Sequence, residues 1–397
     1  MRLAYVCSDP GVPVFGRKGC SIHVQEVLRA LLGLGIEVVL FARRFDGEAP
    51  PGLEALSIYR LEPLPKQDVA KREQAALAAN DTLRAALEHA GPFDLVYERY
   101  ALWSLAAMGY ARDTGIPGLL EVNAPLVDEQ AQHRKLADRA GAVSVSERTF
   151  GMATHLIAVS LEVADYLRGF AGTSERIHVV PNGVDPDRFP QDVVPTLGAA
   201  PGIFTIGFVG SLRPWHGLSV LVEAFAQLYH ANEATRLIVV GDGPERPKLE
   251  SDLSARALCD AVQLVGQVEH SEVPGLLASL DVAVAPYPRL PHFYFSPLKV
   301  YEYMAAGRAV VASGIGQLRQ LIEPEVNGLL CPPGDAAAHA AALERLRRDP
   351  QLARRLGQAA RTTIQQHHSW NTVVRRLLAL AGIRPLQGQR GAIGAVP

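Results

Sequence analysis

The chain has 397 residues, more than a single hydrophobic core usually holds, so we expect two domains of ordinary size. Its content of 48% hydrophobic and 20% charged residues is typical of a globular protein and excludes a disordered one. A net charge of -2 excludes the strongly basic composition of many nucleic-acid-binding proteins, so no nucleic-acid partner is expected.

The cysteines and the apolar runs bear on the cellular compartment. The four cysteines are scattered and lack the paired spacing of a zinc site or a redox dithiol. The apolar run after Arg2 is too short for a signal peptide, and no run approaches the roughly 18 apolar residues that span a bilayer. We therefore expect a cytoplasmic protein with reduced cysteines.

Short β-rich apolar runs alternate with longer helical patterns along the chain. Six runs are expected as strands in the first half, at residues 3–7, 38–41, 95–97, 118–122, 156–159 and 177–180. Six more are expected in the second half, at residues 205–209, 236–240, 262–265, 282–285, 309–312 and 328–331. The alternation predicts an α/β fold in which parallel sheets are covered by helices on both faces.

The same pattern suggests two doubly wound domains. Residues 1–185 would form the first domain and residues 203–367 the second. Between them, residues 186–202 are rich in proline and glycine and lack periodicity, which is typical of a linker. Residues 384–397 have no apolar period and are expected to be a disordered tail. In doubly wound domains, ligands bind at the carboxyl ends of the strands.

The first expected strand leads into a glycine loop with two cations. Gly16 and Gly19 flank Arg17 and Lys18, and a helix is expected from about Ser21. Glycines let a backbone approach a ligand closely, and a helix N-terminus beside two cations favours an anion. The loop lacks the spacing of the dinucleotide fingerprint. Taken alone, a tight turn is the commoner explanation of such a loop.

The second half repeats this arrangement. After the strand at 205–209, Arg213 and His216 come just before a helix. Arginine offers a bidentate fork for phosphate, and an imidazole there can donate to phosphate or protonate a leaving oxygen. Taken alone, His216 is better explained as a surface loop residue. The next strand runs into a turn that contains Gly243, which ordinary turn chemistry explains, although the turn also borders the expected ligand crevice.

The segment SPLKVYEYMAAGRAVVAS places two charges on an otherwise apolar helix. Ser296 is expected as the N-cap and Pro297 as the first helical residue. Free N–H groups at Leu298 and Lys299 could meet an anion, and Glu302, one turn deeper, could accept from two ribose hydroxyls. The alternative is an ion pair between Lys299 and Glu302. Because buried charges are costly unless a ligand needs them, we favour binding.

Five motifs in register resemble the retaining nucleotide-sugar glycosyltransferases of the large bacterial family four. In chain order they are GRKG, PNGVD, FVGSLRPWHG, VVGDGPE and SPLKVYEYMAAGRAVVAS. The resemblance implies the GT-B fold of two facing Rossmann-like domains. It also implies that the first domain binds the acceptor and the second the sugar nucleotide. A final helix at about 368–383 would complete the first domain, with Trp370 as its anchor.

The chain departs from the family pattern around the donor. The family often has a pair of glutamates, of which Glu302 matches the second, the one that holds the ribose, while the first falls on Tyr294. Ser211 takes the place of an arginine near the phosphates, and His216 that of a lysine. Arg213 together with Lys299 would restore the lost cations. A family histidine expected after the fourth strand falls on Asn123.

We therefore interpret the chain as a metal-independent retaining glycosyltransferase of the hexosyltransferase type. The donor would be a nucleoside-diphosphate sugar, with UDP preferred over GDP, and no further cofactor is expected. Asp185 and Asp187 form an Asp-X-Asp pattern that a metal-dependent transferase could use, but the neighbouring prolines favour a turn. No metal ligands are therefore expected.

The expected site residues fall into three groups. The catalytic group is Arg213, His216 and Lys299. The donor-binding group is Gly16, Gly19, Ser211, Gly243, Ser296, Leu298, Lys299 and Glu302. The acceptor-side candidates are Arg17, Lys18, Asn123 and His133, although a solvated helix position is the favoured explanation of His133.

Two other functions remain open on the sequence. One is a GT-B sugar-nucleotide epimerase, which sugar transfer to an added acceptor would separate from a transferase. The other is a sugar-nucleotide-binding protein without turnover. Lys299 and Glu302 favour binding in all three cases, whereas Arg213 and His216 favour turnover. The expected partners are a sugar nucleotide and a small-molecule, glycan or lipid-linked acceptor; peripheral membrane contact and the oligomeric state are left open.

Overall fold

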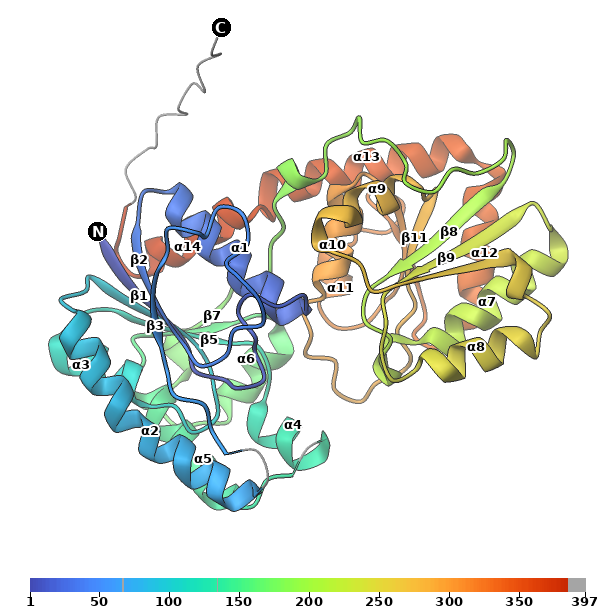
Figure 1. Ribbon diagram of the computed structural model, residues 1–397. Helices are drawn as coiled ribbons and strands as arrows, with labels where there is room; N and C mark the ends of the chain where they lie inside the picture. Colours follow the sequence, from blue (N-terminus) through green and yellow to red (C-terminus); the bar gives the residue numbers. More distant parts are fainter. Residues whose placement is uncertain (66–67, 134, 385–397) are drawn as a thin grey trace, which may run out of the picture. The chain divides into compact units, whose positions relative to one another are not determined.

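The chain forms two compact units, in a computed structural model that describes residues 1–65, 68–133 and 135–384. The first unit comprises Met1–Pro181 and the chain from Trp370 onward, and the second comprises Asn182–Ser369. In each unit, helices lie on both faces of a sheet (Figure 1). Residues 186–202, expected as a linker, belong to the second unit, where Phe189 is buried in the core. Apart from residue 384, the tail expected at 384–397 lies outside the described residues.

The first unit is built on a parallel sheet of seven strands. These are β1 (Arg2–Cys7), β2 (Glu37–Ala42), β3 (Ser57–Arg60), β4 (Leu95–Arg99), β5 (Gly118–Val122), β6 (His155–Ala158) and β7 (Ile177–Val179). The order across the sheet is β3-β2-β1-β4-β5-β6-β7. It reverses between β1 and β4, and this topological switch point is where sheets of this kind bind ligands.

Helices also cover both faces of this first sheet (Figure 1). They are α1 (Gly19–Gly33), α2 (Val69–Ala90), α3 (Ala106–Thr114), α4 (Leu126–His133), α5 (Arg139–Met152), α6 (Leu161–Arg168) and the short 3-10 helix η1 (Ser174–Arg176). The side chains of Asp68, Asp138 and Ser160 each accept a hydrogen bond from a backbone N–H in the first turn of α2, α5 and α6. These bonds satisfy donors that a helix start otherwise leaves unpaired.

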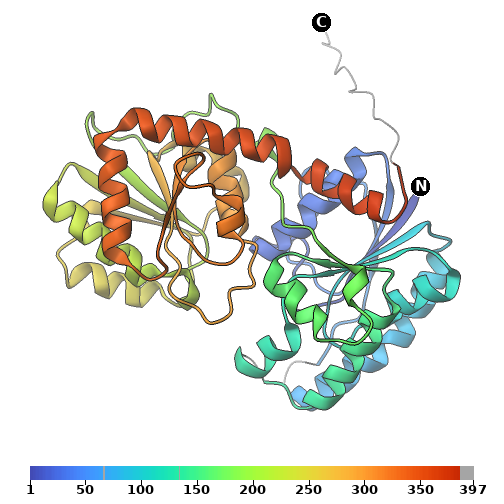
Figure 2. The ribbon, with the colours of Figure 1, turned by 180° about the vertical axis from the view of Figure 1, so that it is seen from behind.

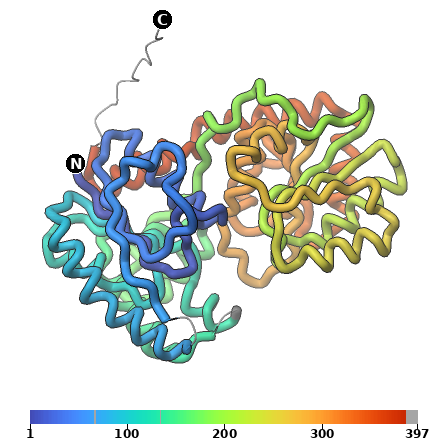
Figure 3. Tube along the Cα trace, viewed as in Figure 1, coloured from blue at the N-terminus to red at the C-terminus, as the bar shows by residue number. Residues whose placement is uncertain are grey.

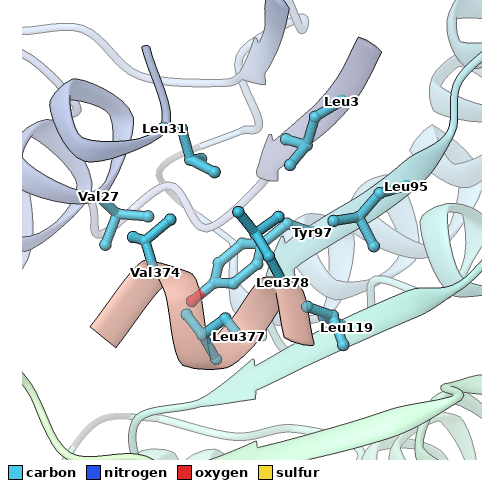
Figure 4. A pocket seen from close by; sticks show the side chains of 9 residues that line it. All are labelled: Leu3, Val27, Leu31, Leu95, Tyr97, Leu119, Val374, Leu377 and Leu378. Atoms are coloured by element: carbon cyan, nitrogen blue, oxygen red, sulfur yellow. The ribbon is translucent and has the colours of Figure 1, made fainter. Parts of the chain in front are cut away.

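The C-terminal helix α14 (Trp370–Leu380) completes the first unit, where it packs on α1 (Figures 2 and 3). Its apolar face fits into a seam between α1 and the sheet (Figure 4). The seam is lined by Leu3, Val27, Leu31, Leu95, Tyr97, Leu119, Val374, Leu377 and Leu378. Trp370 opens the helix, is 3% exposed and lies edge-on to His23, with ring centroids 5.0 Å apart. Burial of these side chains supplies the free energy that holds α14 in place.

The second unit is built on a parallel sheet of six strands. These are β8 (Phe204–Val209), β9 (Thr235–Val240), β10 (Val262–Gly266), β11 (Val282–Ala285), β12 (Ala309–Ser313) and β13 (Leu329–Cys331). The order is β10-β9-β8-β11-β12-β13, so the switch point falls between β8 and β11. The predicted α/β fold with two Rossmann-like domains is confirmed.

Helices cover both faces of this second sheet. They are η2 (Pro186–Arg188), η3 (Pro214–His216), α7 (Leu218–Ala231), α8 (Arg246–Ser254), η4 (Cys259–Ala261), η5 (His270–Glu272), α9 (Val273–Ala278), α10 (Leu298–Ala305), α11 (Leu318–Leu321), α12 (Ala336–Arg348) and α13 (Pro350–His367). The apolar faces of α9, α10 and α11 share one hydrophobic cluster, and those of α7, α8 and α12 share another. In the part of the chain that the structure describes, no helix has the length and apolar character needed to cross a membrane.

Candidate active site

The switch point of the second sheet is bordered by tightly packed turns. A Cβ atom on Gly217 would lie 1.8 Å from the carbonyl oxygen of Pro286, and one on Gly243 would lie 2.3 Å from the carbonyl oxygen of Leu212. Only glycine permits such close backbone contacts. The structure therefore gives Gly243, expected to bind the donor, a packing role at the rim of the site.

Helix α10 starts at this switch point and is fixed to the end of β8. The buried Tyr303 hydroxyl accepts from the N–H of Val209 and donates to its carbonyl, each at 2.8 Å. The first N–H groups of α10, at Leu298 and Lys299, stand where a helix has no internal acceptors. The helix thus presents its positive end at the carboxyl edge of the sheet.

The ammonium group of Lys299 is buried beside this helix end. Its Nζ atom has no hydrogen-bond partner among the described residues. It lies 4.2 Å from the ring centroid of Phe208 and 5.6 Å from that of Tyr287. Burial lowers the pKa of Lys299 from 10.5 to about 7, against the opposing effect of the Glu302 charge. A buried cation with no anionic partner is unfavourable, so the arrangement is suited to an anion that binds from solution.

The imidazole of His216 lies beside the same two aromatic rings as Lys299. Its ring centroid is 6.1 Å from that of Phe208 and 5.9 Å from that of Tyr287. Its Nδ1 atom bonds to the Ser211 carbonyl, which can only accept, so Nδ1 carries the hydrogen. Burial, with the nearby Lys299 charge, lowers the pKa of His216 to about 3. The ring is therefore neutral and its Nε2 atom is the one without a hydrogen, while the role of His216 as a donor to phosphate or an acid stays a prediction.

Arg213 and Ser211 lie on the same turn. Arg213 precedes η3, is partly buried, and holds its guanidinium 5.9 Å from the ring centroid of Trp215. Ser211 has an exposed side chain and contributes its carbonyl to His216. The turn thus brings one permanent cation near enough to His216 to help lower the pKa of its imidazole.

Glu302 pairs with a residue that the sequence analysis missed. The alternative had been an ion pair with Lys299, but the Glu302 Oε1 atom instead lies 2.7 Å from Nε2 of His270. His270 lies on η5, more than two elements earlier in the chain. No periodicity or motif links the two positions, so only the fold could bring them together.

The prediction that Ser296 caps α10 is wrong. The N-cap is Pro297, which makes no side-chain capping bond. The Ser296 hydroxyl instead accepts from the N–H of Asn182 at 3.1 Å, and its carbonyl accepts from the Asn182 side chain at 2.7 Å. Asn182 belongs to the PNGVD motif. Ser296 therefore ties this motif to the start of α10 and makes no capping bond to the helix.

The glycine loop of the first unit leads into α1, which begins at Gly19 rather than at Ser21. Lys18 is the N-cap without a side-chain bond, and both Lys18 and Arg17 are exposed. A Cβ atom on Gly16 would lie 2.9 Å from the Pro13 ring, so this glycine serves loop packing. The loop keeps its two cations at a helix N-terminus, as expected for an anion-binding position.

Asn123 follows β5 and joins a buried polar network of the first unit. Its side-chain oxygen accepts from Arg99, which lies 3.6 Å from the Glu121 carboxylate. Glu121 in turn lies 3.1 Å from Nε2 of His23. Burial raises the pKa of Glu121, but His23 and Arg99 together lower it to about 2. His133, the other candidate nearby in sequence, ends α4, and its side chain lies outside the described part of the structure.

Asp185 and Asp187 form a turn. The Asp185 carboxylate accepts from the N–H of Asp187 at 3.1 Å and caps η2. Over the described ranges, no group of three or more His, Cys, Asp or Glu side chains is arranged to hold a metal ion. The turn that the prolines favoured is confirmed.

The architecture is shared with solved structures of glycosyltransferases. Sucrose-phosphate synthase from Thermosynechococcus elongatus has 23% identity and a TM-score of 0.73, with 96% of this chain and 98% of that chain covered. Anabaena HepE, solved with UDP and glucose, has 19% identity and the same TM-score, with 96% and 99% covered. The molecule is thus a GT-B protein.

Sequence relatives narrow the class. Residues 17–188 match the model "Glycosyltransferase Family 4", and residues 203–349 match "Glycosyl transferases group 1". The 2-deoxystreptamine glucosyltransferase of Streptomyces kanamyceticus is 30% identical, with 83% of this chain and 90% of that protein covered. The D-inositol 3-phosphate glycosyltransferase of Xylanimonas cellulosilytica is 29% identical, with 91% and 90% covered. The chain belongs to the family 4 glycosyltransferases.

Proposed function

We propose that this glycosyltransferase moves a sugar from a nucleoside-diphosphate sugar, with UDP preferred over GDP, to an acceptor hydroxyl with retention of configuration and without a metal ion. The buried, unpartnered ammonium of Lys299 at the start of α10 carries the proposal. A diphosphate supplies the missing anion at the place where the helix N–H groups point outward.

The remaining groups of the second unit fit the rest of the donor. Glu302, one turn deeper in α10, accepts from the ribose hydroxyls. Arg213 contributes a permanent charge at the mouth of the turn after β8. UDP is favoured because HepE, which shares the fold, was solved with UDP and with UDP-glucose.

Bond breaking places negative charge on the diphosphate. As the bond between the sugar carbon and the phosphate oxygen breaks, Lys299 and Arg213 stabilise the charge on the leaving oxygen. The acceptor hydroxyl attacks on the face that the leaving group vacates, and its proton passes to the leaving phosphate oxygen. No protein nucleophile takes part. The approaching anion also raises the pKa of His216, so that Nε2 gains a proton and donates to the diphosphate.

The acceptor is assigned to the first unit. The cations Arg17 and Lys18 at the start of α1, and Asn123 at the end of β5, are its proposed contacts. The acceptor is a small molecule, a glycan or a lipid-linked glycan.

Nucleotide binding tests this proposal directly. The protein is titrated with UDP, GDP, ADP and dTDP, and its unfolding is followed at each concentration. The correct nucleotide at 100 times its Kd should add about 2.7 kcal/mol to the free energy of unfolding. The matching nucleotide sugar should then be consumed in the presence of an extract that contains candidate acceptors. The anomeric configuration of the product is determined by NMR. An inverted product would reject the retaining mechanism, and binding of none of the four would reject the donor site.

A further inference from the structure

His270 is the hydrogen-bond partner that the described residues give to the Glu302 carboxylate. Its Nε2 atom lies 2.7 Å from Glu302 Oε1, and because a carboxylate only accepts, Nε2 carries the hydrogen. Both side chains are mostly buried, with 17% of the imidazole and 14% of the carboxylate exposed. In these surroundings a charge-assisted hydrogen bond orients a carboxylate more firmly than it would in water.

The short helix that carries His270 is itself held in place. Reciprocal hydrogen bonds between Glu269 and Glu272 close η5, and the one from the Glu269 N–H to the Glu272 carboxylate is 2.8 Å long. Helix α9 follows directly and buries Val273 in the same hydrophobic cluster as α10. The imidazole therefore reaches Glu302 from a fixed turn that shares a core with α10.

We infer that His270 is a positioning residue for nucleotide recognition, because it holds one oxygen of Glu302 and so orients the carboxylate toward the ribose hydroxyls. The inference rests on the proposed function, in which Glu302 accepts from those hydroxyls. A mobile glutamate loses rotamer freedom when the nucleotide binds, and this loss weakens affinity. A carboxylate already held by His270 avoids that loss, so a ribose gains affinity that a deoxyribose cannot gain.

The two ring nitrogens provide a matched pair of variants. Nε2 makes the bond to Glu302, whereas Nδ1 is buried and has no hydrogen-bond partner in the described part of the chain. A glutamine places its amide nitrogen near the position of Nε2, and an asparagine places its amide nitrogen near that of Nδ1. His270→Gln therefore keeps the donor, and His270→Asn removes it while keeping a polar side chain.

The test is a comparison of ribonucleotides with their 2′-deoxy forms. Dissociation constants of UDP, 2′-deoxy-UDP, GDP and 2′-deoxy-GDP are measured by calorimetry for the wild type, His270→Gln, His270→Asn and Glu302→Gln. We expect the wild type to prefer the ribose form by about tenfold or more, since a hydrogen bond to a charged group is lost with the 2′-hydroxyl. His270→Gln should keep this ratio. His270→Asn should lower it to about threefold or less, by weaker binding of the ribose form alone.

The outcomes distinguish a failure of the role inferred for His270 from a failure of the proposed function. A folded His270→Asn protein that keeps the wild-type ratio would overturn the inference, and so would equal losses for ribose and deoxyribose forms, which a merely structural histidine predicts. If His270→Asn does not fold, His270→Gln decides, because a ratio as low as that of Glu302→Gln would reject the role of His270. A wild type that binds neither UDP nor GDP would instead overturn the proposed function itself.

Discussion

Lys299→Met removes one charge from the proposed diphosphate site and keeps an unbranched side chain. In the unliganded protein the ammonium is buried without a hydrogen-bond partner among the described residues, over the Phe208 ring. Its removal should stabilise the unliganded fold and weaken nucleotide binding. Opposite effects of this kind are typical of buried groups that serve function at the expense of stability.

The expected gain in the free energy of unfolding follows from the pKa of Lys299. A value of about 7, lowered from 10.5 by burial, corresponds to about 5 kcal/mol of unfavourable free energy in the charged state, since each tenfold change in proton affinity is about 1.36 kcal/mol. The cation–π contact with Phe208 offsets about 2 kcal/mol of this. Lys299→Met should therefore raise the free energy of unfolding by about 3 kcal/mol wherever the lysine is charged in both states.

The requirement that Lys299 be charged in both states sets the pH range over which Lys299→Met is more stable than the wild type. Below pH 7 the lysine is protonated in the folded and the unfolded chain, so the full penalty is present. Between pH 7 and 10.5 the folded chain releases its proton first, and the penalty declines to zero. The advantage of Lys299→Met over the wild type should thus be largest at pH 6 and fade by pH 9.5.

Urea unfolding at pH 6 and pH 9.5, with and without UDP, measures all of these effects. Lys248→Met is the matched control, because Lys248 is exposed and its contacts are surface ones, an ion pair with Asp252 and a hydrogen bond to Ser219. With UDP at saturation the advantage of Lys299→Met at pH 6 should shrink by about 1.5–3 kcal/mol and so nearly disappear, since the wild type alone keeps the charged contact. If Lys299→Met is less stable than the wild type at pH 6 and binds UDP equally well, Lys299 is a scaffold residue and the reasoning fails.

Three further predictions concern pH and metal ions. Because UDP needs the charged form of Lys299, the Kd of the wild type for UDP should increase above pH 7, by up to about tenfold for each pH step of one. In calorimetry, Lys299→Met should show no such dependence. A flat wild-type profile would contradict this prediction. His216→Asn keeps a donor for the Ser211 carbonyl but cannot be protonated. As the pH drops from 6.5 toward 3, the imidazole of the unfolded wild type binds a proton that the buried ring does not bind, so the melting temperature of the wild type should fall more than that of the variant. Parallel curves would count against a neutral buried ring. Sugar transfer should continue in excess chelator, and a complete loss that magnesium or manganese restores would sink the metal-independent mechanism.

Much of the fold could be predicted because buried parallel strands leave a strong local signal. All twelve expected strands are present, since each is a short apolar run between turn residues. The strand β3 was missed because its sequence, SIYR, lies at the sheet edge with a largely exposed burial pattern and carries no apolar run. Gly307 follows the C-cap of α10 with a positive φ of 65°, the place in a helix end where glycine is common and readable from the sequence.

The site was predictable where its residues share one element. Lys299 and Glu302 stood out because two charges interrupt an apolar helix, a contrast that the sequence alone contains. His270 and the tether of Ser296 to Asn182 could not be predicted in this way, because each joins segments that only tertiary packing brings together. In the first unit, Glu121 within the strand GLLEV was the available signal for the buried network with Arg99 and His23.

The position of α14 has a consequence for the order in which the protein is made. The first unit needs Val374, Leu377 and Leu378 to close the apolar seam beside α1, yet these residues are translated after the whole of the second unit. Until they leave the ribosome, the seam stays open to water and to other unfinished chains. A nascent chain therefore holds a completed second unit and an incomplete first one for a time, and a premature stop after Ser369 would leave that state permanent.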